Sequence, residues 1–186
     1  MKTDELSQAW QDVETAYNDE RINSERALQA ILYQSLTAIL PTDYLILVEP
    51  TLAGYCPDMV IANRRAMKIE CVLELKCSPH WWHSENDVRY DLNKLFTYAQ
   101  LVDSEVEFDI FGPQRVFDPN KSCWVAGRPR YAVHDDLLVG FVDIARKESA
   151  VVCRSKMTHP LAKLSSFVLL SGATDPEFQS ATFSVQ

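Results

Sequence analysis

The chain has 186 residues, of which 47% are hydrophobic and 24% charged, and its formal net charge is −8. This length predicts one domain, spanning residues 1–186, with a core large enough to fold without disulfides. No apolar run approaches the ~20 residues of a membrane span, which argues against a membrane partner. The start, Met1–Glu5, carries acids where a signal peptide is basic and then apolar, and the five cysteines contain no CxxC pair. We therefore expect a cytoplasmic protein with reduced thiols.

The negative charge is unevenly distributed along the chain. Residues 1–50 hold nine acids and three bases, whereas residues 111–163 hold nine bases and five acids. A stripe of bases in the second half could face a phosphate backbone, although an ordinary solvated surface explains it equally well. Its members are Arg115, Lys121, Arg128, Arg130, Arg154 and Lys156.

The first part of the chain predicts two helices. Residues 5–20 place four large apolar side chains on one stripe at helical spacing. A second helix begins near Asn23 and Ser24, which are good N-capping residues, and stops before Pro41.

Three strands, a helix and a strand are predicted next. The strand patterns cover residues 44–49, 56–62 and 68–76, with turn residues between them. A helix of about residues 87–102 follows, and residues 105–111 then alternate like a strand.

The pattern weakens beyond Gly112. Residues 137–145 and 150–154 are candidates for a strand pair, and residues 161–170 form an apolar segment of undetermined type. The tail after Gly172 is polar, and we expect it to be loosely held.

Two short motifs on the predicted strands carry the main chemical signal. Pro57-Asp58 is the only Pro-Asp in the chain, and Glu74-Leu75-Lys76 is the only acid-x-Lys. Strand alternation puts Glu70, Val72, Glu74 and Lys76 on one face. Two carboxylates and a lysine can hold a divalent metal and a water beside a phosphodiester. The structural alternative is that Asp58 caps a turn and that Glu74 and Lys76 form a surface ion pair.

This element order and these motifs resemble the PD-(D/E)XK phosphodiesterase superfamily over about residues 22–111. The resemblance implies an α/β, restriction-endonuclease-like fold: an αβββαβ core with a central mixed sheet flanked by helices. An N-terminal helix and a C-terminal extension at 112–186 would be added to it. It also implies a metal-dependent nuclease, with DNA as the expected nucleic acid. Whether the substrate is DNA or RNA, and whether cleavage is endo or exo, stays open.

The resemblance assigns roles to the motif residues. Asp58 and Glu74 would bind Mg²⁺, or alternatively Mn²⁺, with the Leu75 carbonyl as a further ligand. Lys76 would orient or activate water, and Glu25 would assist from the preceding helix. Glu25 could instead simply stabilise the N-terminus of that helix.

The helix after the strands carries the expected substrate contacts. Asp91, Lys94 and Tyr98 fall at i, i+3 and i+7, on one face. Some exonuclease-like members have Gln-x-x-x-Tyr here, whereas this chain has Lys94 and Tyr98, which leaves the subfamily open. The alternative is a solvated Asp91–Lys94 pair with Tyr98 packed on the core.

Other signals compete with this interpretation. Cys77-x-x-His80-x-x-His83 has spacing that zinc can use, but a closed structural site wants four ligands and no second Cys/His pair stands nearby. The intervening Trp81 and Trp82 could stack on bases or close over the core. A nuclease-like fold without catalysis, acting as a nucleic-acid-binding or assembly module, is the alternative function, and a homodimer is compatible with either.

Overall fold

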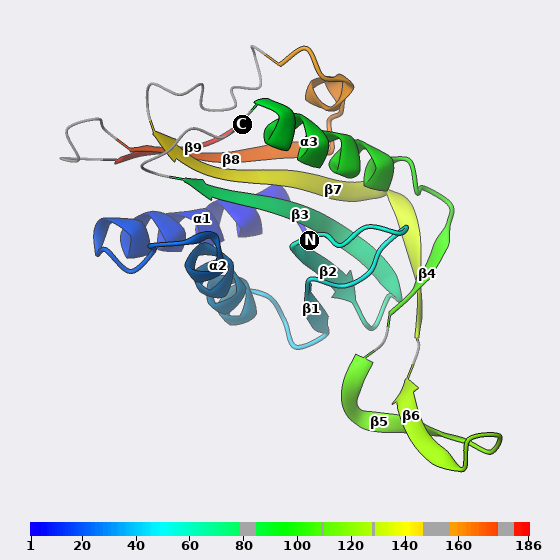
Figure 1. Cartoon of the computed structure of the whole chain (residues 1–186). Helices are drawn as coiled ribbons and strands as arrows, with labels where there is room; N and C mark the ends of the chain where they lie inside the picture. The colour runs from blue at the N-terminus through cyan, green and yellow to red at the C-terminus, as the bar shows by residue number, and fades with distance from the viewer. Residues whose placement is uncertain (79–84, 109, 128, 147–156, 175–180) are drawn as a thin grey trace.

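The computed structural model describes residues 1–78, 85–108, 110–127, 129–146, 157–174 and 181–186. One sheet forms the centre of the molecule, with α1 and α2 covering one face and α3 the other (Figure 1). The expected α/β class is confirmed. No helix within the described ranges is long and apolar enough to cross a membrane.

The three helices match their predicted positions to within a few residues. They are α1 (Thr3–Asn18), α2 (Glu25–Ile39) and α3 (Glu85–Ala99). The Ser24 hydroxyl caps α2 by accepting a hydrogen bond from the Ala27 backbone N–H at 3.2 Å. A short 3-10 helix, η2 (Pro160–Lys163), lies near α3.

The sheet is mixed and has seven strands in the order β1-β2-β3-β7-β8-β9, with β4 paired to β7 outside that path. The pairs β1–β2, β2–β3 and β8–β9 are antiparallel, whereas β7 runs parallel to both β3 and β8. The strands are β1 (Tyr44–Val48), β2 (Met59–Asn63), β3 (Lys68–Ser78), β4 (Glu105–Glu107), β7 (Arg130–Arg146), β8 (Phe167–Thr174) and β9 (Ala181–Val185).

The strand predicted at residues 105–111 is wrong as a core strand. Only three of these residues form β4, which pairs with the beginning of β7. The chain then enters a separate hairpin of β5 (Ile110–Asp118) and β6 (Cys123–Gly127), which projects from the body (Figure 1). The central position beside β3 belongs to β7. A parallel strand covered on both faces must be apolar on both, which fits residues 137–145, whereas both glutamates of β4 are exposed.

The C-terminal tail also differs from the expectation. It returns as β9, which pairs with β8, and Phe183 packs at 5.1 Å between ring centroids against Trp10 of α1. The expectation of a loose tail is therefore wrong, because pairing with β8 and contact with α1 let this short segment partly bury an aromatic ring. Residues 137–145 are a strand but pair with β3 and β8, and residues 150–154 lie outside the described ranges.

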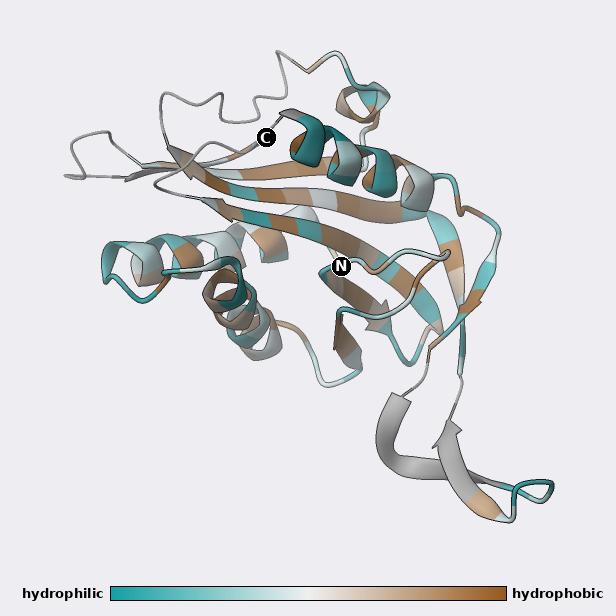
Figure 2. Ribbon diagram, in the orientation of Figure 1, coloured by the Kyte–Doolittle hydropathy of each residue, from teal (hydrophilic) through white to brown (hydrophobic). Residues whose placement is uncertain are grey.

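Two hydrophobic clusters hold the layers together, one on each face of the sheet. Leu73 and Leu75 point to the α1–α2 side, and Val72 points to the α3 side. Figure 2 shows hydrophobic residues dominating the central strands β7 and β8. Alternation from Cys71 onward therefore turns Glu74 and Lys76 toward α3.

Glu70 does not share their face, contrary to the expectation. The register of β3 shifts between Ile69 and Cys71, and these two residues enter different hydrophobic clusters. The Glu70 carboxylate instead accepts hydrogen bonds from Tyr44 Oη and Asn63 Nδ2, each at 3.0 Å. A bulge interrupts strict alternation, and periodicity alone does not reveal it.

Phe141 tests the central placement of β7. It is fully buried on the α3 side, so Phe141→Ala should lower the free energy of unfolding by about 3–5 kcal/mol through lost burial and a cavity. Val48→Ala on the edge strand, where the side chain is 45% exposed, should change it by less than about 1 kcal/mol. Urea denaturation of both variants measures the difference, and equal values would place β7 outside the core.

Candidate active site

The β2–β3 ladder ends just before the acid-x-Lys motif. Its last pair is Met59 with Leu73, and the preceding Pro57 has no N–H to extend it. The Asp58 carboxylate takes over and accepts a hydrogen bond from the Leu75 backbone N–H at 2.6 Å. The two sequence motifs are therefore joined by a hydrogen bond at the open edge of β3.

Asp58 is itself held in place through its backbone carbonyl. That oxygen accepts hydrogen bonds from Gln29 Nε2 of α2 at 2.9 Å and from the Glu49 backbone N–H at 3.1 Å. Glu25 lies one helical turn before Gln29 and approaches the same edge. Its carboxylate accepts a hydrogen bond from the Cys77 backbone N–H and lies 3.9 Å from Lys76 Nζ.

A chain of ion pairs connects the α3-side face of β3 to α3. Lys94 Nζ lies 2.6 Å from Glu74 Oε2 and 3.2 Å from Asp91 Oδ1. Lys76 Nζ lies 2.9 Å from Asp91 Oδ2. The Tyr98 hydroxyl donates a longer hydrogen bond, at 3.5 Å, to Glu74 Oε1. One helix face thus orients both the acid and the lysine of the motif.

All seven predicted site side chains meet in this one region, but they are not equally accessible. Tyr98 is fully buried and the Asp91 side chain is 5% exposed, so both orient other site residues and neither offers surface to a substrate. Tyr98 packs on the core, as the alternative interpretation expected. The solvated Asp91–Lys94 pair of that alternative is wrong, because the Lys94 side chain is only 12% exposed.

The pKa values of the three carboxylates at the site are all raised. Burial, with a smaller contribution from the neighbouring Asp58 charge, raises the pKa of Glu74 to about 8 against the lowering effect of Lys94. Burial also raises the pKa of Asp58, although the Leu75 N–H and Lys76 oppose it. The pKa of Glu25 is raised in the same way, by burial and by Asp58. Each shift indicates a group whose charged form would gain from a nearby cation.

The pKa values of the two lysines are also raised, but here burial opposes the shift and the neighbouring carboxylates cause it. Burial alone would lower the pKa of Lys76, but the hydrogen bond and charge of Asp91 outweigh it, so its pKa is raised. The pKa of Lys94 is raised in the same way, because the hydrogen bond to Glu74 and the charge of Glu74 outweigh burial. Both ammonium groups therefore stay protonated at neutral pH.

These residues offer oxygen ligands that fit part of the coordination shell of a hard divalent cation, with water or phosphate oxygens as the remaining ligands. Asp58 and Glu74 supply carboxylates, and the Leu75 carbonyl lies on the same strand edge as its N–H, next to Asp58. Within the described ranges, no three His, Cys, Asp or Glu side chains converge closely enough to hold a metal alone. Mg²⁺ is commonly held by one or two carboxylates with waters and substrate phosphate, so this set matches Mg²⁺ better than zinc.

Two residues join the site without having been predicted. Gln29 anchors Asp58, and its signal in the sequence is its i+4 spacing from Glu25. Asp143 of β7 pairs in register with Lys76, is fully buried, and its charge helps to raise the pKa of Cys77. Its signal is an acid in the middle of an apolar strand, a position that a charge rarely occupies without a partner.

Several other predicted features fall elsewhere. His80, His83, Trp81 and Trp82 lie outside the described residues. Burial, together with the charges of Glu25 and Asp143, raises the pKa of Cys77 to about 12, which disfavours the thiolate that zinc requires.

The basic stripe offers few described side chains. Arg130 pairs with Glu107 at 2.6 Å, and Lys121 lies 3.9 Å from Asp118. Three members are outside the described residues: Arg128, Arg154 and Lys156.

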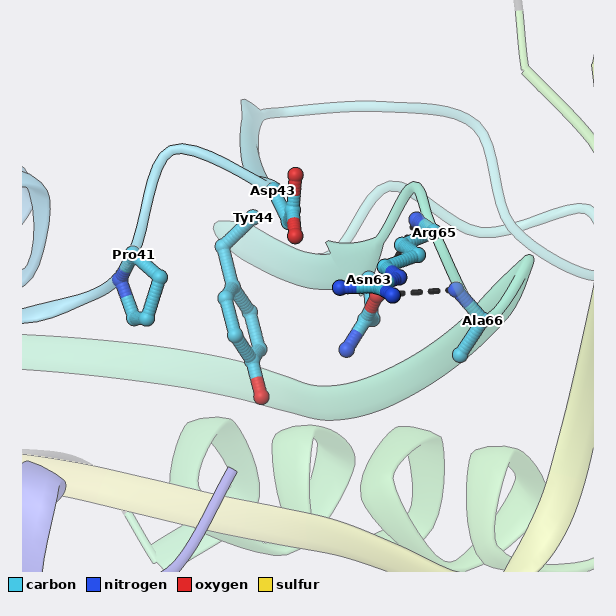
Figure 3. Close-up of a pocket in the computed structure, with 6 residues that line it drawn as sticks. All are labelled: Pro41, Asp43, Tyr44, Asn63, Arg65 and Ala66. Carbon is cyan, nitrogen blue, oxygen red and sulfur yellow. Dashed lines mark hydrogen bonds between the residues drawn. The ribbon is translucent and has the colours of Figure 1, made fainter.

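A surface pocket of about 490 Å³ lies away from Asp58 and Glu74 (Figure 3). It opens at the far end of β2, five residues and roughly 17 Å along the strand from Asp58. The Asn63 side chain that borders it accepts hydrogen bonds from the Arg65 and Ala66 backbone N–H groups, so it shapes the β2–β3 turn. The pocket is lined by Pro41, Asp43, Tyr44, Asn63, Arg65 and Ala66.

Comparison of the chain with protein-family models, curated proteins and solved structures finds no match.

The raised pKa of Glu74 predicts how stability depends on pH. Between its ordinary value of 4.5 and about 8, the folded protein binds this proton more tightly than the unfolded chain does. The contribution of Glu74 is fully present below pH 4.5 and is lost as the pH rises to about 8. Glu74→Gln cannot ionise, so its free energy of unfolding should fall less over this range. Urea denaturation at several pH values checks this, and parallel pH profiles for the two proteins would contradict it.

Lys94 gives a second stability prediction. Lys94→Met leaves Glu74 and Asp91 buried without this cation, which should lower the free energy of unfolding by about 1–3 kcal/mol at pH 9. The loss should shrink at pH 5, where Glu74 is protonated in the folded state. Lys68→Met is the control, because its partner Asp136 is 60% exposed and such pairs contribute less than about 1 kcal/mol. Equal losses in both variants would show that burial of Lys94 does not matter.

Proposed function

We propose that the protein is a Mg²⁺-dependent nuclease that hydrolyses phosphodiester bonds of nucleic acid, with DNA as the expected substrate. One observation carries the proposal. The Asp58 carboxylate is bonded to the Leu75 N–H, inside the motif that also places Glu74 and the protonated Lys76 on the α3 side. Acids with raised pKa values beside paired lysines form an unusual arrangement for a purely structural role, because burying charge is costly.

The arrangement of elements supports the same proposal. When β4, β5 and β6, which lie between α3 and β7, are set aside, the segments α2, β1, β2, β3, α3 and β7 follow the order helix, three strands, helix, strand. We propose that they correspond to a restriction-endonuclease-like core, with β7 in the position first expected for residues 105–111. The C-terminal strands β8 and β9 then extend that core.

The residues divide the work of hydrolysis between them. Asp58 and Glu74, with the Leu75 carbonyl, would hold Mg²⁺, which when bound polarises the phosphate and acidifies its water. Glu25 extends the acidic edge toward Lys76 and would position a water there. Gln29 fixes the backbone of Asp58, while Lys94 and Tyr98 fix the Glu74 carboxylate.

Lys76 fits stabilisation of charge better than base catalysis. Its raised pKa keeps the ammonium protonated, so it would donate to the phosphate oxygens or orient the attacking water through hydrogen bonds. A protonated lysine cannot accept the proton of that water. The ammonium acts where negative charge develops on the phosphate, which is where a fixed cation lowers the barrier most.

One observation favours the alternative of a silent binding or assembly module. Lys94 already lies 2.6 Å from Glu74 and supplies part of the positive charge that a metal would bring. In that case Mg²⁺ would neither bind nor stabilise the fold. Thermal unfolding with and without Mg²⁺ separates the two, because a ligand that binds only the folded state raises the melting temperature. The nuclease requires a rise for wild type and a smaller one for Asp58→Ala.

The direct test of the proposal is cleavage. Linear duplex, circular duplex and single-stranded DNA, together with single-stranded RNA, should be incubated with the protein at several Mg²⁺ and Mn²⁺ concentrations. Metal-dependent products are expected from wild type and not from Asp58→Ala or Glu74→Gln. Products that persist in both variants would identify a contaminating enzyme and refute the assigned site.

Lys76→Met should separate binding of the metal from chemistry. The variant should keep its fold and its Mg²⁺ affinity, because Lys76 is not a ligand, while cleavage falls by about a hundredfold or more. Glu74→Gln should lower Mg²⁺ affinity more than Lys76→Met does, because a neutral amide is a poorer ligand. Calorimetry and initial cleavage rates measure the two effects. A wild-type rate in Lys76→Met would remove Lys76 from the mechanism.

A further inference from the structure

Two exposed tyrosines border the acidic site. Among the described Phe, Tyr and Trp residues, three are exposed: Tyr33 at 41%, Tyr55 at 38% and Tyr90 at 58%. Tyr33 lies on α2, whereas the other two each reach Glu74 through a single intervening residue. Both rings lie beside the proposed site, and their position there invites a functional explanation.

Tyr90 is linked to Glu74 through Lys94. It lies one turn before Lys94 on α3, and Lys94 Nζ is 5.5 Å from the ring centroid. The same ammonium is 2.6 Å from Glu74. Lys94 Nζ therefore lies over one face of the ring, and the Tyr90 residue is 58% exposed.

Tyr55 is linked to Glu74 through Tyr98. The two rings meet edge to face, at 6.3 Å between centroids and 85° between planes, and the Tyr98 hydroxyl donates to Glu74. Reciprocal backbone hydrogen bonds of 2.8 and 3.0 Å join Tyr55 to Leu52, which is 2% exposed on the α3-side core. The loop thus presents Tyr55 from an anchored turn.

We infer that Tyr55 and Tyr90 stack on unpaired bases on either side of a phosphate at Glu74, and that the substrate class is single-stranded nucleic acid. The inference rests on the proposed function for the placement of that phosphate. Bases within a duplex are already stacked on one another, so only an unpaired base can offer its face to a side chain.

The charge of the protein favours the same substrate class. The chain carries a net charge of −8, and Lys76 and Lys94 are both paired with carboxylates. Attraction to a polyanion is therefore weak at this site, and duplex binding depends mostly on phosphate contacts. Stacking of bases on aromatic rings contributes binding free energy without needing net positive charge.

Binding of a labelled oligothymidine tests the inference. Fluorescence anisotropy, with Ca²⁺ replacing Mg²⁺ to suppress cleavage, should be compared for three probes of equal length: oligothymidine, an oligomer of abasic sites, and a blunt duplex. Wild type should bind oligothymidine about fivefold or more tighter than the abasic oligomer, because the latter keeps the phosphates and lacks the bases. The duplex should bind more weakly than oligothymidine.

Matched variants locate the stacking. Tyr90→Leu should lose about fivefold or more of the affinity for oligothymidine and little for the abasic oligomer, whereas Tyr90→Phe should keep the affinity. Tyr55→Leu should behave like Tyr90→Leu. Tyr33→Leu is the control, because it removes a tyrosine on α2 that is 41% exposed and should leave binding unchanged. If Tyr55→Leu does not fold, Tyr90→Leu alone decides, since the Tyr90 side chain is the more exposed of the two, at 58%.

The outcomes separate this inference from the proposed function. Unchanged oligothymidine binding in Tyr90→Leu, or tighter binding of duplex than of oligothymidine, overturns the stacking sites even if Mg²⁺-dependent cleavage occurs. Tyrosine-dependent binding without cleavage of any substrate supports the stacking sites and refutes the nuclease. Tyrosine-dependent binding together with preferential cleavage of single strands supports both.

Discussion

The burial of the Glu74 carboxylate constrains everything around it. Glu74 lies in the middle of β3 and beneath α3, with its side chain 1% exposed, where a charge loses most of its hydration. Lys94 and Tyr98 of α3 supply the hydrogen bonds that replace part of that hydration. The pKa of about 8 shows that the replacement is incomplete. A carboxylate whose charged form is only partly stabilised by its neighbours is suited to bind a cation.

A second constraint comes from the end of the β2–β3 ladder. Pro57 stops the pairing, so the Leu75 and Cys77 backbone N–H groups at the edge of β3 need other acceptors. The carboxylates of Asp58 and Glu25 satisfy them. The hydrogen bonds that complete the fold at this edge are therefore the same ones that bring the acids together, which couples the stability of the sheet to the geometry of the site.

The parallel arrangement of β3 and β7 explains how one helix can organise the site. A parallel connection needs a long crossover, and α3 forms part of it while packing over the face that Glu74 and Lys76 share. Its apolar residues enter the core through Leu92 and Leu95. Its polar residues Asp91 and Lys94 then meet β3 where that strand changes from apolar to charged. Packing and ion pairing on this helix follow from a single helical face.

The sequence by itself determined what depends on neighbours along the chain. Helix limits followed from local signals such as Ser24 and Pro41, and the placement of Glu74 and Lys76 on one shared face followed from alternation within one strand. The sequence also indicated Asp58, Glu74 and Lys76, because these charges interrupt apolar strand patterns.

Only the tertiary structure decided what depends on distant pairing. The central strand is β7 and not residues 105–111, because burial on both faces selects the more apolar strand whatever its position in the chain. The bulge at Glu70, the β9 edge strand, and the roles of Gln29 and Asp143 depend on contacts between segments far apart in sequence. Tyr98 and Asp91 changed from expected substrate contacts to buried supports for the same reason: local spacing places a side chain on a face, but the packing of other elements decides whether that face meets solvent.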